Sequence, residues 1–443
     1  MPSIKTLDTT IPISDIFAHF ADETDAVILE STLQNRLGRF SIIGRAPYLK
    51  IEKRKGRLWV NDEPRDEDFS AYLKEYLQTN HAENPTHLPL IDGAIGFFAY
   101  DYNRGTQADF PEAILRFYDQ LIIADHETQK VHLIANGKLQ DPETAIQSLL
   151  DTIRRGELCS PATIATTAPT GKITIRPNFE KEAYKHAIDR MIKHIIEGDI
   201  YIANMTQRLD ITSDRTPYEV YARLRAKNPA PFAAYLNYKN LQIVCASPER
   251  FLQMKDRKVT TRPIKGTRKR GATKEEDEAL KEELRRSEKD RSELLMIVDL
   301  ERNDLNRVCI PGSVKVDELF TIESYATVHH LVASISGTLE EDLTAIDLIE
   351  HTFPGGSITG APKIRAMEII DELEHGNRGL YTGSIGYLSL NGDCDLNIVI
   401  RTAVHTDGTY HLGVGGGITC ESDLEFEYEE TLQKAKALLD ALS

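Results

Sequence analysis

The sequence predicts an α+β fold built from antiparallel sheets and amphipathic helices. Strand-like segments follow one another without a helix between them, and this order favours antiparallel sheets over a parallel strand–helix–strand repeat. With 443 residues, 41% of them hydrophobic, the chain could form two or three average domains or one large body. The expected strands include 200–211, 241–247, 386–390, 396–404 and 410–415.

Helices are predicted where apolar residues recur with helical spacing. One such run covers 184–196, and Gly198 ends it. Ser287 can cap a helix over 289–302, and proline opens another over 362–374, where its missing N–H costs nothing. The last helix, over 422–442, is expected to turn these residues inward: Phe426, Leu432, Ala435, Leu439 and Leu442.

Composition excludes several classes of partner. The net charge of −16 argues against nucleic acid or an anionic membrane surface. No segment approaches the ~18 uninterrupted apolar residues of a membrane span, and the first residues do not form a signal peptide, so we expect a soluble, cytoplasmic protein. The cysteines are scattered without a CxxC pair, which indicates reduced thiols: Cys159, Cys245, Cys309, Cys394 and Cys420.

Two residues suggest catalysis. Lys265 lies in TRPIKGTRKRG between a strand end and a turn, among four other basic residues, although a solvated basic loop explains this stretch about as well. Glu249 lies in ASPERF, directly after an apolar strand. A half-buried carboxyl there would have a raised pKa and could act as a general acid, whereas a surface ion pair with Arg250 is the alternative.

Paired acidic residues suggest a metal site. Asp290 and Glu293 are spaced i, i+3 on one expected helix, and Glu427 and Glu430 repeat the spacing on another. Two such helices could meet across Mg²⁺, which prefers oxygen ligands. An exposed i, i+4 ion pair between Glu430 and Lys434 is equally consistent with the pattern.

Glycine-rich segments suggest an anion site. FPGGSITGAPK, 353–363, leads into a helix N-terminus, and GVGGG, 413–417, exposes further backbone amides. Neither is a Walker A loop or a dinucleotide fingerprint, so a small carboxylate fits better than a nucleotide. Glycines that serve only tight turns are the alternative.

In this order, the motifs resemble those of the chorismate-utilising enzymes. The resemblance rests on ASPERF, RPIKGTR, KDRSELLMIVDLERNDL, VHHLVASI, FPGGSITGAPKIRAMEIIDELE, RGLYTGSIGYLS, NIVIRT and GVGGGITCESDLEFEYEET, and in the first half on AVILEST, GRFSIIGRAP and GAIGFFAYDYNR. It implies an α/β sandwich of two packed antiparallel sheets flanked by helices. We expect an N-terminal region over 1–155 of one intertwined body, a linker or excursion over 156–177, and a chorismate-binding catalytic region over 178–443.

The lysine position distinguishes enzyme types within this family. Anthranilate synthase component I typically carries alanine, in PIAGTR, whereas aminodeoxychorismate synthase component I carries lysine, in PIKGT; this chain has PIKGTR. Isochorismate and salicylate synthases place a base lysine on an earlier strand, where this chain has Ile202, so activation of water at C2 is not expected. The resemblance therefore favours amination of chorismate at C4, in para-aminobenzoate and folate biosynthesis.

The resemblance also implies a mechanism. Lys265 attacks C2 of chorismate while the C4 hydroxyl leaves, with Glu249 as proton donor; ammonia then adds at C4 and expels the lysine. A partly desolvated lysine among cations has a lowered pKa and is a usable nucleophile. Glu293 and Glu430, with Glu427 through water, are expected to hold Mg²⁺. Substrate binding is expected from these residues: Gly266, Thr267, His330, Ser357, Tyr381, Arg401, Gly415, Gly416, Gly417 and Lys434.

Partners and alternatives follow from the same resemblance. A separate glutamine amidotransferase subunit should supply ammonia, because no cysteine here lies in a nucleophile-like GxCxG setting. The alternatives are anthranilate synthase component I and a non-catalytic chorismate- or tryptophan-binding protein on the same scaffold. Relatives bind tryptophan through residues that match the following: Ser31, Gly38, Arg39, Phe40, Pro231, Phe232 and Ala233.

Overall fold

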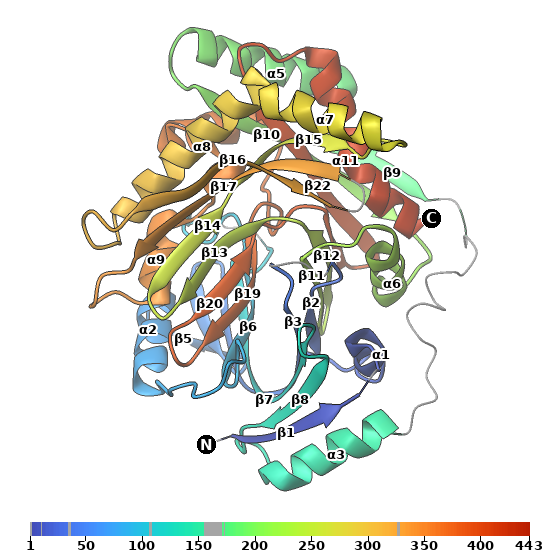
Figure 1. Cartoon of the computed structure of the whole chain (residues 1–443), viewed down its shortest axis with the longest axis vertical. Helices are drawn as coiled ribbons and strands as arrows, with labels where there is room; N and C mark the ends of the chain where they lie inside the picture. The colour runs from blue at the N-terminus through green and yellow to red at the C-terminus, as the bar shows by residue number, and fades with distance from the viewer. Residues whose placement is uncertain are drawn as a thin grey trace.

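Antiparallel pairing joins the strands of this protein into one hydrogen-bonded network that bends into two facing arms (Figure 1). Two long strands, β3 (Phe40–Arg54) and β7 (Ala113–Asp125), pair along most of their length and connect the arms. The computed structural model describes residues 2–9, 11–33, 37–105, 109–154, 171, 173–325 and 328–443.

Each arm extends from one of the two connecting strands. The first arm continues from β7 in this order: β6 (Gly93–Phe98), β19 (Ser384–Ser389), β20 (Cys394–Asn397), β13 (Arg250–Lys255), β14 (Lys258–Arg262) and β17 (Val328–Thr338), which also pairs with β15 (Ile264–Lys269) and β16 (Lys315–Ser324). The second arm continues from β3 in this order: β2 (Val27–Glu30), β11 (Phe232–Tyr238), β12 (Leu241–Ser247), β21 (Thr402–Thr406), β22 (Thr409–Ile418) and β10 (Ile202–Thr212), which also pairs with β9 (Thr174–Pro177) and β18 (Gly360–Ala361).

The remaining strands flank the two connecting strands. They are β1 (Ser3–Asp8), β4 (Arg57–Val60), β5 (Glu63–Arg65) and β8 (Lys130–Ala135). The helices are α1 (Ile13–Ala18), α2 (Phe69–Thr79), α3 (Pro142–Arg154), α5 (Lys181–Ile196), α6 (Pro217–Lys227), α7 (Lys274–Arg286), α8 (Glu288–Asn306), α9 (Ala345–Thr352), α10 (Lys363–Leu373) and α11 (Leu424–Leu442), with a 3₁₀ turn η1 (Gly356–Ile358).

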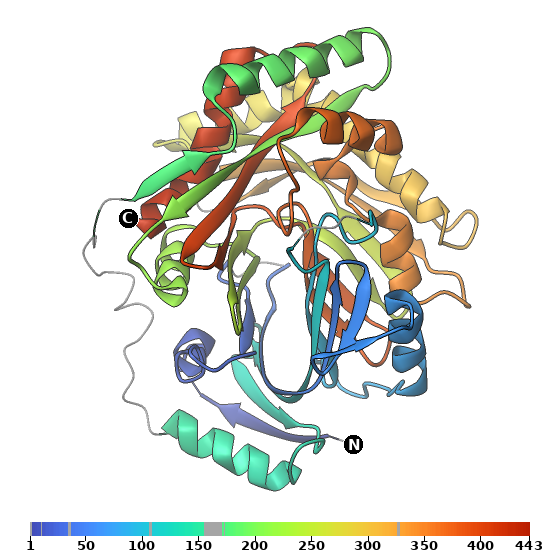
Figure 2. The ribbon, with the colours of Figure 1, turned by 180° about the vertical axis from the view of Figure 1, so that it is seen from behind.

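Apolar packing defines the layers. Residues of both arms, such as Ile243 of β12 and Ile385 of β19, share one buried cluster, which forms the interior of the sandwich. Helices α2, α8 and α9 pack on the first arm, α1, α6 and α11 pack on the second, and α3 packs on β8 and β1. Helices α5 and α10 pack on β10 (Figure 2). The predicted sandwich of antiparallel sheets with outer helices is confirmed, with its sheets joined through β3 and β7.

Most helix predictions are confirmed. Helix α5 ends two residues before Gly198, which adopts a φ of +86°. The Ser287 side chain accepts a hydrogen bond from the Asp290 amide at the start of α8. On α11 the predicted inward position of Phe426 is wrong, because its side chain is 59% exposed. No helix in the described ranges is both long enough and apolar enough to cross a membrane.

One predicted strand is interrupted. The run 396–404 was expected to be continuous, but β20 ends at Asn397 and β21 begins at Thr402. Between them the Ile398 amide donates to the Glu249 carbonyl, and Arg401 adopts a φ of +51°. The chain therefore leaves the regular ladder where Arg401 turns toward the interior.

The two halves of the chain share both arms. Strand β2 of the first half pairs with β11, and β6 pairs with β19. Most of the expected linker, 156–170 and 172, lies outside the described residues, as does Cys159, whereas its end forms β9, paired with β10. The other four cysteines are free thiols, and Cys420 is the exposed one.

Candidate active site

A cavity of about 530 Å³ brings together side chains from elements far apart in the sequence. Its walls come from strands β15 and β22, helices α8 and α11, the turn η1 and the segment before β21. Every residue predicted to act in catalysis, Mg²⁺ binding or chorismate binding lines it: Glu249, Lys265, Gly266, Thr267, Glu293, His330, Ser357, Tyr381, Arg401, Gly415, Gly416, Gly417, Glu427, Glu430 and Lys434.

Lys265 reaches the cavity from a bulged strand. The pairing of β15 with β17 shifts register between Lys265 and Thr267, and a bulge of this kind redirects the neighbouring side chains. Gly266 has a φ of +73°, and a Cβ atom there would lie 2.8 Å from Cγ of Asp290. The Lys265 Nζ donates to the Ser357 carbonyl at 3.2 Å. The turn expected after Lys265 is therefore a bulge within β15, and glycine is required there by its positive φ and by the approach of α8.

The three arginines near Lys265 are paired with carboxylates, contrary to the expectation that they would act on its amine. The charged groups that interact with Lys265 across the cavity are instead Glu249 and Glu293. The ion pairs are Arg262 with Glu318 and Glu323, Arg268 with Glu283 and Asp290, and Arg270 with Asp277. Lysine reactivity here therefore needs a cause other than repulsion by these arginines.

Glu249 is buried, with 6% of its surface exposed. Burial raises the pKa of its carboxyl, while hydrogen bonding by the Ser357 side chain and the charge of Lys265 oppose the rise. The alternative ion pair with Arg250 does not form, because Arg250 pairs with Asp395 at 2.9 Å. A buried carboxyl beside an amine is suited to donate a proton to a leaving group.

The predicted magnesium ligands face one another from α8 and α11. Burial raises the pKa values of Glu293 and Glu427, and Glu430 raises both further by its negative charge. A Cβ atom at Gly416 would lie 2.7 Å from Oε2 of Glu430, so glycine leaves room for this carboxylate against β22. Carboxylates gathered in this way fit a hard divalent cation such as Mg²⁺.

The alternative interpretation of Glu430 also holds in part. Lys434 Nζ lies 3.1 Å from Glu430 Oε2 and donates to the Gly415 carbonyl at 2.9 Å. This i, i+4 pair lies on the face of α11 that lines the cavity. Glu430 and Lys434 therefore face the cavity, where a ligand would bind, and also pair with each other.

Two glycine amides of β22 point to its open edge. The partners of Gly415 and Gly417 on β10 are Thr206 and Asn204, whose own amides donate away from β22, to Glu374 and Thr359. Since hydrogen-bond direction alternates along an antiparallel ladder, the Gly415 and Gly417 amides also point away from β10. By the same alternation the amide of Gly416 is directed into the ladder, so the prediction that all three amides bind substrate is too broad.

Arg401 and His330 provide the polar end of the cavity. The Arg401 guanidinium has no hydrogen-bond or ion-pair partner among the described residues, and its burial lowers its pKa. Burial, together with the charge of Arg401, lowers the pKa of His330 to about 4. His330 Nδ1 lies 2.9 Å from the Thr267 hydroxyl. A neutral histidine and an unpaired arginine favour binding of a carboxylate.

Some lining residues were missed by sequence reasoning. Lys289 lies on α8 and lowers the pKa values of Glu293 and Glu427 by its charge, so it acts on carboxylates of both helices of the site. Phe426 lines the mouth, where its position in an apolar pattern had suggested core packing. The motif KDRSE contains Lys289 directly before Asp290, which was the available signal.

A second cavity, of about 520 Å³, collects the residues that match the tryptophan site of relatives. The Ser31 hydroxyl oxygen lies 3.0 Å from the carbonyl oxygens of both Phe40 and Pro231 and can donate its one proton to either. Gly38 does not line the cavity, but a Cβ atom there would lie 3.1 Å from Cβ of Ser31. The lining residues are Ser31, Arg39, Phe40, Pro231, Phe232 and Ala233. Tryptophan binding stays a prediction.

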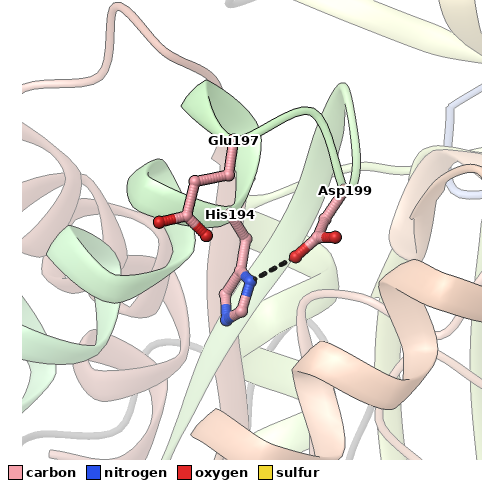
Figure 3. A group of neighbouring side chains, drawn as sticks. All are labelled: His194, Glu197 and Asp199. Carbon is pink, nitrogen blue, oxygen red and sulfur yellow. Dashed lines mark hydrogen bonds and ion pairs between the residues drawn. The ribbon is translucent and has the colours of Figure 1, made fainter.

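One compact group of metal-ligand types lies outside both cavities. His194, Glu197 and Asp199 present ligand atoms within 4.8 Å of one another at the turn between α5 and β10 (Figure 3). His194 Nδ1 and Asp199 Oδ2 are 2.7 Å apart, and Arg365 also pairs with Asp199. These contacts are those of a surface ion-pair cluster.

Comparison with known proteins agrees with the motifs. The family model described as chorismate binding enzyme matches residues 25–440. Aminodeoxychorismate synthase component 1 of Bacillus subtilis (strain 168) is 38% identical, covering 94% of this chain and 91% of its own length. Anthranilate synthase component 1 of Acetivibrio thermocellus is 36% identical, covering 98% of this chain and 93% of its own length. The crystal structure of anthranilate synthase component I from Streptococcus pneumoniae TIGR4 aligns with a TM-score of 0.81 at 31% identity, over 92% of this chain and 93% of that chain. The chain belongs to the chorismate-binding enzyme family.

Proposed function

We propose that this chain is component I of an aminodeoxychorismate synthase, which converts chorismate and ammonia to 4-amino-4-deoxychorismate. The observation that carries the proposal is the position of Lys265. Its Nζ reaches the cavity beside Ser357, and the buried carboxyl of Glu249 lines the same cavity. A nucleophilic amine and a proton donor at one ligand site are the two groups that this reaction requires.

In the proposed reaction, the Lys265 amine forms a bond to C2 of chorismate. The ring double bonds shift, and the C4 hydroxyl leaves as water with the proton of Glu249. Ammonia then forms a bond to C4, the double bonds shift back, and the bond between C2 and Lys265 breaks. The new ammonium group at C4 returns a proton to the Glu249 carboxylate. Burial keeps Glu249 protonated at higher pH than an exposed glutamate, which supports its role as the donor.

The cavity also supplies binding groups. Glu293 and Glu430, with Glu427 through water, would hold Mg²⁺, which when bound supplies positive charge for the ring carboxylate. Arg401 and the open amides of Gly415 and Gly417 would hold the substrate's carboxylates, because guanidinium and amide donors suit carboxylate oxygens. These groups fix the ring relative to Lys265.

Anthranilate synthase component I is the second candidate, because the relatives include both enzymes. Lys265 discriminates between them, since amination at C2 needs no lysine nucleophile. Purified chain should be incubated with chorismate, Mg²⁺ and ammonium salt, and the amino product identified by chromatography and mass spectrometry. We expect 4-amino-4-deoxychorismate; anthranilate as the main product would favour the second candidate.

The chain is expected to use ammonia but not glutamine when it acts alone. Burial raises the pKa values of Cys309 and Cys394 to about 11 and about 12, and it also raises that of Cys245, so these thiols are poor nucleophiles. The names of the component 1 relatives imply a second component, which would be the glutaminase. Ammonium salt should support turnover, whereas glutamine should support none until a glutaminase subunit is added. Glutamine-dependent product from the pure chain would contradict this expectation.

A further inference from the structure

Glu301 is a buried carboxyl to which the proposed reaction assigns no role. It lies on α8, eight residues after Glu293, and only 8% of its surface is exposed. Its Oε2 atom lies 2.9 Å from the hydroxyl oxygen of Thr261, at the end of β14. The same hydroxyl oxygen lies 2.8 Å from the carbonyl oxygen of Phe251 on β13.

The two contacts of Thr261 agree with a protonated Glu301. A threonine hydroxyl has one proton to donate, and a backbone carbonyl can only accept. Phe251 lies where the pairings of β13 with β14 and β20 both shift register, so its carbonyl lies within an irregular part of the ladder. If the hydroxyl donates to Phe251, the short contact with Glu301 is a hydrogen bond only when the carboxyl is protonated and donates to Thr261.

The charges around Glu301 agree with a neutral carboxyl. The pKa of Glu301 is raised to about 8, with burial as the largest cause. The negative charges of Glu249 and Asp304 also raise it, whereas the hydrogen bond from Thr261 and the charge of Lys363 lower it. Lys363 Nζ, on α10, is already engaged by Asp304 at 2.5 Å and by the carbonyls of Thr352 and Pro354 at 2.8 Å. Its three N–H groups are therefore used by other acceptors.

We propose that Glu301 is a neutral carboxylic acid in the folded protein, and that its hydrogen bond to Thr261 positions the catalytic elements relative to one another. Phe251 follows Glu249 by two residues, and Thr261 precedes Lys265 by four. The Glu301–Thr261–Phe251 chain thus ties α8, which carries Glu293, to β13, which begins directly after Glu249, and to β14, which ends three residues before Lys265. The catalytic consequence rests on the proposed function; the protonation state does not.

Glu301 also packs under the turn that contacts both catalytic groups. A Cβ atom at Gly356 would lie 3.3 Å from Cγ of Glu301. The next residue, Ser357, accepts a hydrogen bond from Lys265 through its carbonyl and interacts with Glu249 through its side chain. Ionisation of Glu301 would place a negative charge behind this turn and would remove its donor to Thr261, so Glu301 is a positioning residue with a pH limit.

The protonation state can be tested without any assay of activity. Infrared difference spectra of wild type and Glu301→Gln at neutral pH should show the carbonyl stretch of a protonated carboxyl in the wild type alone. A matched variant, Glu288→Gln, removes an exposed carboxyl from the same helix and should leave that band in place. If Glu301→Gln leaves the spectrum of protonated carboxyls unchanged at neutral pH, Glu301 is ionised and the proposal is overturned.

Thermal unfolding gives a second test. A carboxyl with a folded pKa near 8 and an unfolded pKa near ~4.3 stabilises the fold fully below the unfolded value, and this contribution is lost as pH rises to 8. Glutamine stays neutral and can donate to Thr261, so the Tm of Glu301→Gln relative to wild type should rise between pH 5 and 8 and then level off. A Tm difference that does not change with pH would overturn the proposal.

The positioning role of Glu301 is tested by the pH dependence of kcat. At saturating chorismate and ammonia, wild-type kcat should fall as Glu301 ionises near pH 8, and Glu301→Gln should lack this fall. Thr261→Val, which leaves Glu301 without its acceptor, should lower kcat more than it changes KM. If wild type and Glu301→Gln share one pH profile, Glu301 does not position the site. Absence of any aminated product in the wild type would instead argue against the proposed function.

Discussion

Replacing Lys265 with alanine is expected to change the product of the enzyme as well as its rate. Among the described residues, the hydrogen bond of the Lys265 side chain is to the Ser357 carbonyl, so the cavity, the glutamates and Glu249 should remain in place without it. Removing the amine opens space beside C2, where ammonia can enter. The product should shift from 4-amino-4-deoxychorismate toward 2-amino-2-deoxyisochorismate or anthranilate, as measured by mass spectrometry.

The rate of the Lys265→Ala protein should fall by ~10²-fold or more, because a tethered amine has an effective concentration of about 10⁵ M or above that free ammonia cannot match. Lys269→Ala is the matched control, since this exposed lysine is on the same strand, outside the cavity lining. It should leave both rate and product near those of the wild type. Wild-type rates of 4-amino-4-deoxychorismate formation by Lys265→Ala would show that Lys265 is not the nucleophile.

Glu293→Gln and Glu430→Gln are each expected to abolish activity while the fold stays intact. Glutamine keeps the shape of the side chain but removes the charge that Mg²⁺ needs. A loss of ~10²-fold or more is expected, since even indirect partners of metal ligands cost 10–100-fold. The measurement is turnover at saturating Mg²⁺, together with the circular dichroism of each variant.

Glu429→Gln is the control for this pair of variants. It is an exposed residue next to Glu430 on α11, where it pairs with Lys181 at the surface. We expect its activity to match the wild type, because surface ion pairs contribute little. If Glu293→Gln or Glu430→Gln retained more than a few per cent of wild-type activity, these glutamates would be structural ion-pair residues and the Mg²⁺ site would lie elsewhere.

The sequence predicts elements well where the signal is local. The cap at Ser287, the end of α5 before Gly198 and the proline before α10 each depend on a few neighbouring residues, and each is confirmed. The active-site residues predicted from the family resemblance also line one cavity. The family motifs predict this site because they identify residues that are far apart in the sequence and meet only in the folded protein.

What the sequence could not predict depends on contacts made at long range. The arginines near Lys265 find carboxylates on other elements, such as Glu318 and Glu323 for Arg262. Arg401 lies in an apolar run whose pattern predicts one continuous strand, but the backbone leaves the strand there with a φ of +51° at Arg401. Glu301 has no local signal, because its partner Thr261 lies 40 residues away in the chain. Burial and pairing of charges are properties of the folded structure.

The central claim, that Lys265 bonds to the substrate ring, is tested most directly by peptide mass spectrometry. Wild-type protein should be mixed with chorismate and Mg²⁺ in the absence of ammonia, quenched and digested. Without ammonia the covalent intermediate cannot be resolved at C4, so the peptide that contains Lys265 should gain the mass of chorismate less one water. An unmodified Lys265 peptide, in a preparation that still forms 4-amino-4-deoxychorismate when ammonia is added, would contradict the account.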